Sequence, residues 1–457
     1  MDIIPDIINL VRCVEDAKKA FLDGDDGPPA PTNFNQLKGR LEVSRNKFPP
    51  MYLENFVEPY VNHLNKIGEA GFMNILLRDP RRIRQAGLML DIAQAITQNG
   101  EGYNEIAIDA FEEVCSDLMD GFLSAEDRKG AKPPDEGVIP PLVKFGERLS
   151  GPYVWSVPAT KSFDCKAAVV SLPPSHARIG LLGWAALGHE VTGHAILHAD
   201  TGLIEELQQT VLNALQNQGF KDGLPEYWSK RIDETASDVC GILNMGPVVG
   251  IAIIGYFRGL NAARSGGEPK LSNEGGLDEH PADILRGYLA AYTTSLLSFG
   301  GAANWAQVIE AETNKDLSSV TLEGKNISAE DAKKSASIVA SAIVNTKLTS
   351  LENHALGEIQ NWHDSDEEIV KNDLVPVLTT LKAVSPDLEE GIYAAHVVAA
   401  AVEAGLSKDA DISSIFSIMI RTLKVMHDKN PSWGPLFITQ PGNLYRHSIS
   451  SLFRSGT

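Results

Sequence analysis

The amino-acid sequence predicts a mainly α-helical fold of the α+β class, with a small mixed sheet between helical N-terminal and C-terminal regions. Apolar residues recur at three- and four-residue spacing through much of the first and last thirds of the 457 residues. This period is typical of helices. Short β-branched segments next to prolines occur in the middle of the chain, and they are typical of strands. Helices on both sides of one small sheet are therefore expected.

The N-terminal region, residues 1–145, is expected to be helical. Residues 7–22 and 34–120 carry the helical period, and the turn-rich segment DGDDGPPAPTN at 23–33 separates them. Residues 124–141 are polar and rich in proline, a composition typical of a linker or a long surface loop. We therefore predict a domain boundary close to residue 145.

The middle region, residues 146–305, is expected to hold the strands and the functional residues. Residues 153–157 and 167–172 are predicted strands, and a helix is predicted for 176–198. The second strand has two interpretations: an edge strand that pairs with an extended substrate, or an ordinary interior strand. The Gly-rich segment 263–281 is predicted to be a long loop, and long loops in compact domains are often functional.

The C-terminal region, residues 306–457, returns to the helical period. Ser328 and Asp331 form a variant of the capping box and predict the start of a long helix there. Further helices are expected at about 366–383, 387–405 and 411–427.

Composition disfavours two classes of partner. The formal net charge of −20 repels phosphate, so neither a nucleic acid nor an anionic membrane is an expected partner. The most apolar stretch, Gly241–Phe257, has 17 residues. A bilayer-spanning helix needs roughly 20. We therefore interpret this stretch as a buried core helix.

The cysteines and the N-terminus favour a reducing compartment. The 4 cysteines are scattered without a C-x-x-C pair, and we expect them to be reduced and buried. Asp2, Pro5 and Asp6 stand where a secretory signal would carry basic residues and an unbroken apolar run. A cytoplasmic location is the resulting expectation.

The chemistry-bearing residues begin with the segment HEVTGH, which contains His189, Glu190 and His194. Two imidazoles can bind Zn²⁺, and a glutamate beside the first can take a proton from the water that the metal activates. Positions five apart on a regular α-helix diverge by roughly 140°, whereas positions four apart diverge by about 40°. Both histidines reach one ion if a π-type turn absorbs the extra residue, and Gly193 makes that distortion easier.

Two alternatives remain for this segment. A regular α-helix would instead align Glu190, His194 and His198, which are spaced by four residues. Alternatively, no metal binds, and the segment is a core helix whose polar groups satisfy one another. His198 and Asp200 are otherwise expected to support the site or lie on the surface.

A second element, IDETASDV at 232–239, favours the metal site. Glu234 and Asp238 are four residues apart in a helical context and share one face. Glu234 can supply a third ligand, while Asp238 accepts the outer N–H of a ligand histidine and fixes its tautomer. A catalytic zinc has three protein ligands and an open position, a count that His189, His194 and Glu234 satisfy.

These two elements resemble the gluzincin metallopeptidases, and HEVTGH resembles the H-E-x-x-G-H motif of the dipeptidyl peptidase III family. The resemblance implies a zincin-like catalytic core and one zinc per chain. It also implies ligation by His189, His194 and Glu234, with Glu190 as the general base. It covers about 50 residues of 457, and it departs from the family after His194.

A third element, His280-Pro-Ala-Asp-Ile-Leu-Arg286, resembles a segment of the prenyl-protein endoprotease family. The resemblance implies that His280 faces the scissile carbonyl, where a donor would stabilise the developing oxyanion. Arg286 could bind a substrate carboxylate or pair internally with Asp283. Tyr288 and Tyr292 are weaker candidates for the same oxyanion role, and Tyr288 is also a candidate for contact with substrate.

The sequence thus predicts a zinc-dependent metallopeptidase that acts on a peptide or protein substrate. Two rivals are a non-catalytic helical scaffold and a metal-binding protein without peptidase activity. Metal content and dependence on Glu190 separate the peptidase from the scaffold, and a panel of unrelated peptides left uncut would favour the metal-binding protein.

Overall fold

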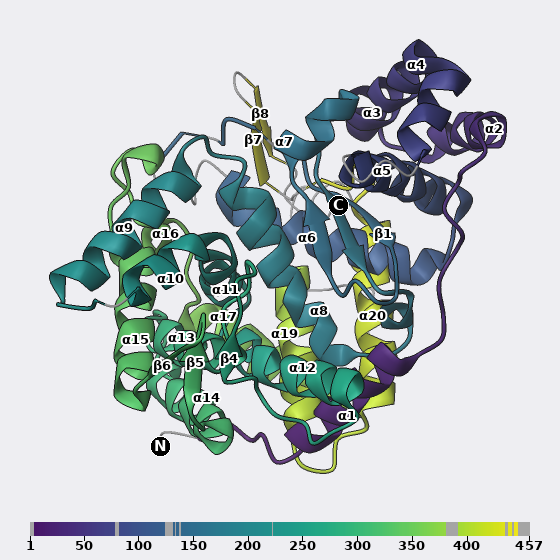
Figure 1. The fold of residues 1–457 in the computed structure, drawn as a ribbon. Coiled ribbons are helices and arrows are strands. Elements are labelled where there is room, and N and C mark those ends of the chain that lie inside the picture. The colour runs from purple at the N-terminus through teal and green to yellow at the C-terminus, as the bar shows by residue number, and fades with distance from the viewer. Residues whose placement is uncertain are drawn as a thin grey trace.

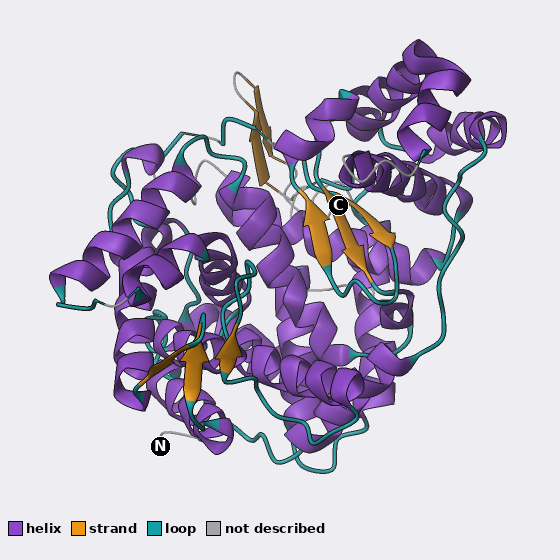
Figure 2. Cartoon of the chain, viewed as in Figure 1, coloured by secondary structure: helices purple, strands orange, loops and turns teal. Residues whose placement is uncertain are grey.

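The computed structural model describes residues 4–77, 82–123, 131–132, 134–136, 139–221, 223–380, 392–434, 437–440 and 443–446. Figures 1 and 2 show a mainly helical protein with small sheets, so the predicted fold class is confirmed. The predicted linker at 124–141 lies partly outside the described residues, as does the start of the helix expected at 387–405.

The N-terminal helices contribute to two hydrophobic cores. They are α1 (Leu10–Leu22), α2 (Phe34–Ser44), α3 (Pro50–Tyr52), α4 (Glu58–Leu76), α5 (Ile83–Glu101) and α6 (Glu105–Leu123), with a 3₁₀ turn at Arg45–Lys47 and a π-helical turn at Leu53–Val57. Helices α2 to α5 (Figure 1) bury their apolar faces in a small core, which they share with residues such as Leu142 and Val169. Helix α1 packs against α12 and α6 against α20, so these two join the larger core.

The first sheet lies between the two cores. It consists of β1 (Leu142–Phe145), β2 (Tyr153–Trp155) and β3 (Val169–Leu172) in the order β1-β3-β2, with β3 parallel to β1 and antiparallel to β2. Val169 faces the small core and Val170 the large one. Burial on both faces explains the continuous apolar run of β3. Of the two interpretations of this segment, the structure shows the interior strand, and β2 is an edge strand.

The middle region continues as helices. They are α7 (Val157–Thr160), α8 (Leu181–Leu187), a π-helix (Gly188–Ala195), α9 (Leu203–Asn217), α10 (Leu224–Lys230), α11 (Ile232–Met245), α12 (Val248–Ser265), α13 (Asp283–Thr294) and α14 (Ala302–Asp316), with 3₁₀ turns at Lys161–Phe163 and Pro174–Ala177. The stretch Gly241–Phe257 is buried as expected but is not one helix. Gly246, with φ of 79°, ends α11, and Pro247 precedes α12. No helix in the described part of the chain combines the length and the apolar character needed to cross a membrane.

A second sheet, which the sequence did not predict, fixes part of the Gly-rich loop. Its strands are β4 (Glu274–Gly275), β5 (Val320–Leu322) and β6 (Lys325–Ile327) in the order β4-β5-β6. Strand β4 lies inside the segment predicted as a loop. It pairs with β5, where Glu274 is opposite Thr321, and local periodicity cannot indicate so distant a partner.

The C-terminal region packs around α6, α8 and α9. Its elements are α15 (Ala329–Asn345), α16 (Leu356–Ile359), α17 (Asp364–Glu368), α18 (Val375–Thr380), α19 (Ala394–Leu406), α20 (Ile412–Asp428), β7 (Phe437–Gln440) and β8 (Asn443–Arg446), with a 3₁₀ turn at Thr349–Leu351 and a π-helical turn at Ile369–Leu374. The predicted cap of α15 is confirmed, since the Ser328 hydroxyl accepts the Asp331 N–H at 2.9 Å. All four cysteines are buried and free, as expected.

His176, in the turn before α8, predicts a pH-dependent loss of stability. Its side chain is buried, and burial lowers its pKa from 6.5 to about 4. The unfolded chain therefore binds a proton that the folded chain excludes, and stability falls as pH drops from about 6.5 toward 4. Between pH 7 and pH 5 this residue should cost about 2 kcal/mol. His176→Phe, which cannot be protonated, should show a correspondingly smaller loss in urea unfolding at the two pH values. An unchanged pH dependence in this variant would contradict the assignment.

Candidate metal centre

His189 and His194 lie on the same side of a π-helix. Helix α8 ends at Leu187 and continues as the π-helix Gly188–Ala195. A π-helix bonds residue i to i+5, so two residues five apart return to the same face. The widened turn expected from the five-residue spacing is therefore present.

Small residues let this π-helix approach α11 closely. A Cβ atom on Gly193 would lie 2.3 Å from Ser237 Cβ, and one on Gly188 would lie 3.2 Å from Gly241 Cα. Both are too close for a larger side chain to fit without displacing the helices. Glycine at these positions brings the histidines against the acidic face of α11.

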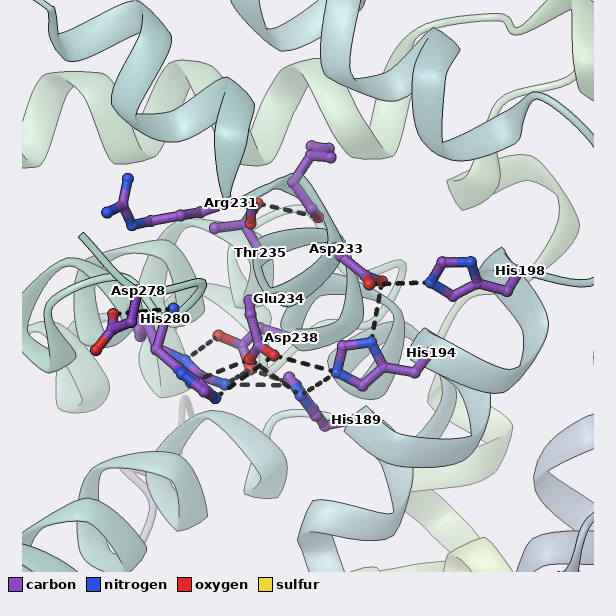
Figure 3. Close-up of polar contacts among 12 residues, drawn as sticks. His189, His194, His198, Arg231, Asp233, Glu234, Thr235, Asp238, Asp278 and His280 are labelled. Atoms are coloured by element: carbon purple, nitrogen blue, oxygen red, sulfur yellow. Dashed lines mark hydrogen bonds and ion pairs between the residues drawn. The ribbon is translucent and has the colours of Figure 1, made fainter. Parts of the chain in front are cut away.

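The structure brings His189, His194 and Glu234 together (Figure 3). The two Nε2 atoms are 3.1 Å apart, and each lies 3.4 Å from an oxygen of Glu234. Zinc bonds of 2.0–2.1 Å in a tetrahedral site imply about 3.3 Å between neighbouring ligand atoms. His189 Nε2 is near Glu234 Oε2 and His194 Nε2 is near Glu234 Oε1, so the two nitrogens and the carboxylate are spaced as ligands of one zinc ion.

Carboxylates on α11 fix the orientation of both imidazoles. His189 Nδ1 lies 2.8 Å from Asp238 Oδ1, and His194 Nδ1 lies 2.9 Å from Asp233 Oδ1. A carboxylate accepts, so each Nδ1 carries the hydrogen, and in the neutral ring the lone pair is on Nε2. With both rings neutral, two lone pairs would converge at 3.1 Å, an arrangement that a cation between them stabilises.

The ionisation of these groups also favours positive charge at the centre. Burial opposes protonation of His189, but hydrogen bonds to Asp238 and Glu234 outweigh it and raise its pKa to about 9. The pKa of His194 is likewise raised against burial, by hydrogen bonds to Asp233 and Glu234. Burial would raise the pKa of Glu234, but hydrogen bonds from both histidines lower it well below its usual value. A divalent cation would supply the charge that these groups favour.

Arg286 supports the centre from α13. Its Nε and Nη2 each lie 2.7 Å from an oxygen of Asp238, and its Nη1 lies 3.5 Å from Glu234. Only 5% of its side chain is exposed. Among the described residues Arg286 does not form the predicted ion pair with Asp283, whereas contact with a substrate carboxylate stays a prediction, since Arg286 lines the cavity. Its guanidinium is already paired with Asp238, and Asp283 instead accepts from Asn261 and the Ser272 N–H.

Glu190 is buried beside the ligands and lines the cavity. Burial raises the pKa of its carboxyl, and the charges of His189 and His194 partly offset the rise. A pKa moved toward neutrality suits a group that takes and returns a proton.

His280 is held by a well-anchored loop. Its Nε2 lies 3.6 Å from Glu234 Oε1, and 63% of its side chain is exposed. Before it, Arg231 donates to the Gly276 carbonyl at 2.6 Å; after it, the Ala282 N–H donates to the Tyr227 hydroxyl at 3.0 Å. The loop is thus tied on both sides of His280 to α10 and to Arg231, which lies between α10 and α11, a support that sequence spacing did not indicate.

Other predicted residues lie elsewhere. Tyr288 is buried, and its hydroxyl donates to Asn314 Oδ1 at 2.9 Å. Neither Tyr288 nor Tyr292 is among the residues that line the cavity. The proposed contact of Tyr288 with substrate therefore does not fit the structure, because its side chain points into the packing of α13 against α14 and α15.

His198 is near the centre but separate from its three ligand atoms. Its Nε2 lies 2.9 Å from Asp233 Oδ2, so Asp233 contacts His194 and His198 at once. Sequence reasoning gave Asp233 no role, although its position next to Glu234 is a usable signal. The regular-helix alternative required His194 and His198 to group with Glu190. Among the described residues they group with Asp233 instead.

The centre opens into a cavity of about 810 Å³. Tyr153 and Val154 of β2 line one part of it, and α8, α11 and α12 line others. A concave site with convergent polar groups is the usual form of a substrate site. No protein-family model, curated protein or solved structure matches this chain, so the interpretation of the site rests on the geometry of its own residues.

Proposed function

We propose that this protein is a zinc-dependent metallopeptidase, with one zinc held by His189, His194 and Glu234 and with Glu190 as general base. The observation that carries the proposal is the convergence of His189, His194 and Glu234: the two Nε2 atoms are 3.1 Å apart, each is 3.4 Å from one oxygen of the Glu234 carboxylate, and each Nδ1 is held by another carboxylate. Two histidines and one carboxylate, with a fourth position open to a cavity, are typical of catalytic rather than structural zinc.

The chain's own residues supply the remaining steps. When bound, zinc would polarise the substrate carbonyl and favour ionisation of a water. Glu190 takes a proton from the attacking water and passes it to the leaving amine. Asp238, held by Arg286, keeps His189 in the ligating tautomer.

Two features orient a peptide in this proposal. The edge strand β2 pairs with β3 on one side, and its residues line the cavity, so an extended substrate backbone can add to its other side. His280, on its anchored loop, is placed to donate to the developing oxyanion.

The test is to measure zinc in the purified wild-type protein and its hydrolysis of a mixed peptide panel. The proposal expects about one zinc per chain, together with peptide cleavage that a chelator stops and zinc restores. Zinc without cleavage of any peptide would favour the metal-binding rival. Failure to bind zinc, even after reconstitution, would favour the scaffold.

A further inference from the structure

One wall of the cavity is apolar and belongs to a single helix face. Its members follow the three- and four-residue spacing of α12. We name this surface the α12 wall, and it consists of Val249, Ile253, Tyr256, Phe257 and Leu260, all of which line the cavity.

Val249, Ile253 and Tyr256 of the α12 wall are buried and also belong to the large core, and a further face of α12 is covered by α1. A Cβ atom on Gly259 would lie 2.9 Å from Ala17 of α1, which shows how closely that face is covered. Helix α13 packs against α12 as well (Figure 1). In contrast, Phe257 and Leu260 are only half-buried and border the cavity. Apolar surface left beside a polar centre gains free energy when an apolar group covers it.

Direct contacts connect the α12 wall to the metal centre. The guanidinium carbon of Arg286 lies 4.6 Å from the centre of the Phe257 ring. The same guanidinium is bonded to Asp238 at 2.7 Å, and Asp238 is bonded to His189 at 2.8 Å. A group that rests on Phe257 is therefore close to a bond positioned at the ligands.

We propose that the α12 wall is the specificity subsite of the peptidase and binds a large aliphatic or aromatic side chain next to the bond that is cut. This inference rests on the proposed function and adds the class of substrate. A peptide side chain suits the site because the edge strand β2 lines the same cavity and can hold the adjoining backbone.

The test compares peptides that differ only in one residue beside the scissile bond. Wild-type protein should cut the Leu and Phe peptides with a kcat/KM about 10- to 100-fold above that of the Ala peptide. Ala186 of α8 is half-buried and lines the same cavity. Ala186→Phe should fill the subsite. The ratio of kcat/KM for the Leu or Phe peptide to kcat/KM for the Ala peptide should then fall close to that of a non-selective enzyme, while the Ala peptide is still cut.

Controls separate loss of selectivity from damage to the fold. Ala70→Phe adds the same ring at an exposed position of α4, outside the cavity lining, and should keep the wild-type ratio. Leu260→Ala shortens the wall and should lower the ratio even if Ala186→Phe fails to fold. Because the readout is a ratio, a general loss of active protein does not move it.

Three results would overturn the inference. Equal cleavage of all peptides by zinc-loaded wild type would refute the subsite while the proposed function stands. A strong preference for lipid-modified over unmodified peptides would assign the wall to a lipid group instead. A wild-type protein that holds no zinc and cuts no peptide would remove the proposed function and the subsite with it.

Discussion

Replacing Glu190 by glutamine should abolish peptide hydrolysis while leaving zinc bound. Glutamine keeps the size of the side chain but cannot accept the proton of the attacking water. Loss of a general base lowers kcat by about 10²- to 10⁴-fold. Glu190 does not belong to the group of His189, His194 and Glu234 that could hold the metal, so zinc content should stay at the wild-type value. The measurement is kcat with a cleaved peptide, beside zinc per chain by elemental mass spectrometry.

Glu205→Gln is the matched control for this variant. Glu205 is an exposed glutamate on α9 and does not line the cavity, so this change should leave both kcat and zinc unchanged. Full activity in Glu190→Gln would rule out the base role. Loss of zinc in Glu190→Gln would instead indicate that Glu190 is a ligand, as in the regular-helix alternative.

Replacing His189 by alanine should remove zinc, whereas replacing His198 should not. His189 is one of the three residues grouped so that they could hold a metal ion, and in the proposed site its loss leaves too few ligands for a catalytic zinc. His198 contacts Asp233 and not the centre itself. We expect zinc per chain to fall from about one to near zero in His189→Ala and to stay near one in His198→Ala. Both variants are dialysed against the same zinc buffer before elemental analysis.

The folding of each variant must be checked beside its metal content. Far-UV circular dichroism of His189→Ala should retain the helical signal, because alanine favours helix and the apolar residues of the large core are unchanged. If His198→Ala loses zinc and His189→Ala keeps it, the metal site is the group of His194, His198 and Asp233. Zinc retained by both variants would place the metal elsewhere.

Local sequence was sufficient to predict the class of fold and to select the candidate metal ligands that the geometry supports. Helical periodicity needs only neighbouring residues, and it predicted most helices. The five-residue spacing of His189 and His194 conflicts with a regular α-helix, and that conflict predicted the π-turn that the structure contains. The i to i+4 relation of Glu234 and Asp238 likewise placed both on one face.

Tertiary packing decided which partner each supporting side chain has. Arg286 lies 48 residues from Asp238 in sequence, and only the crossing of α11 and α13 joins them. Packing also brings Asp233 into contact with two histidines, His194 and His198. It likewise places β3 at the centre of its sheet, between β1 and β2. The pattern within one element shows which residues share a face. Which faces then meet depends on long-range packing, and this packing cannot be read from local patterns in a single sequence.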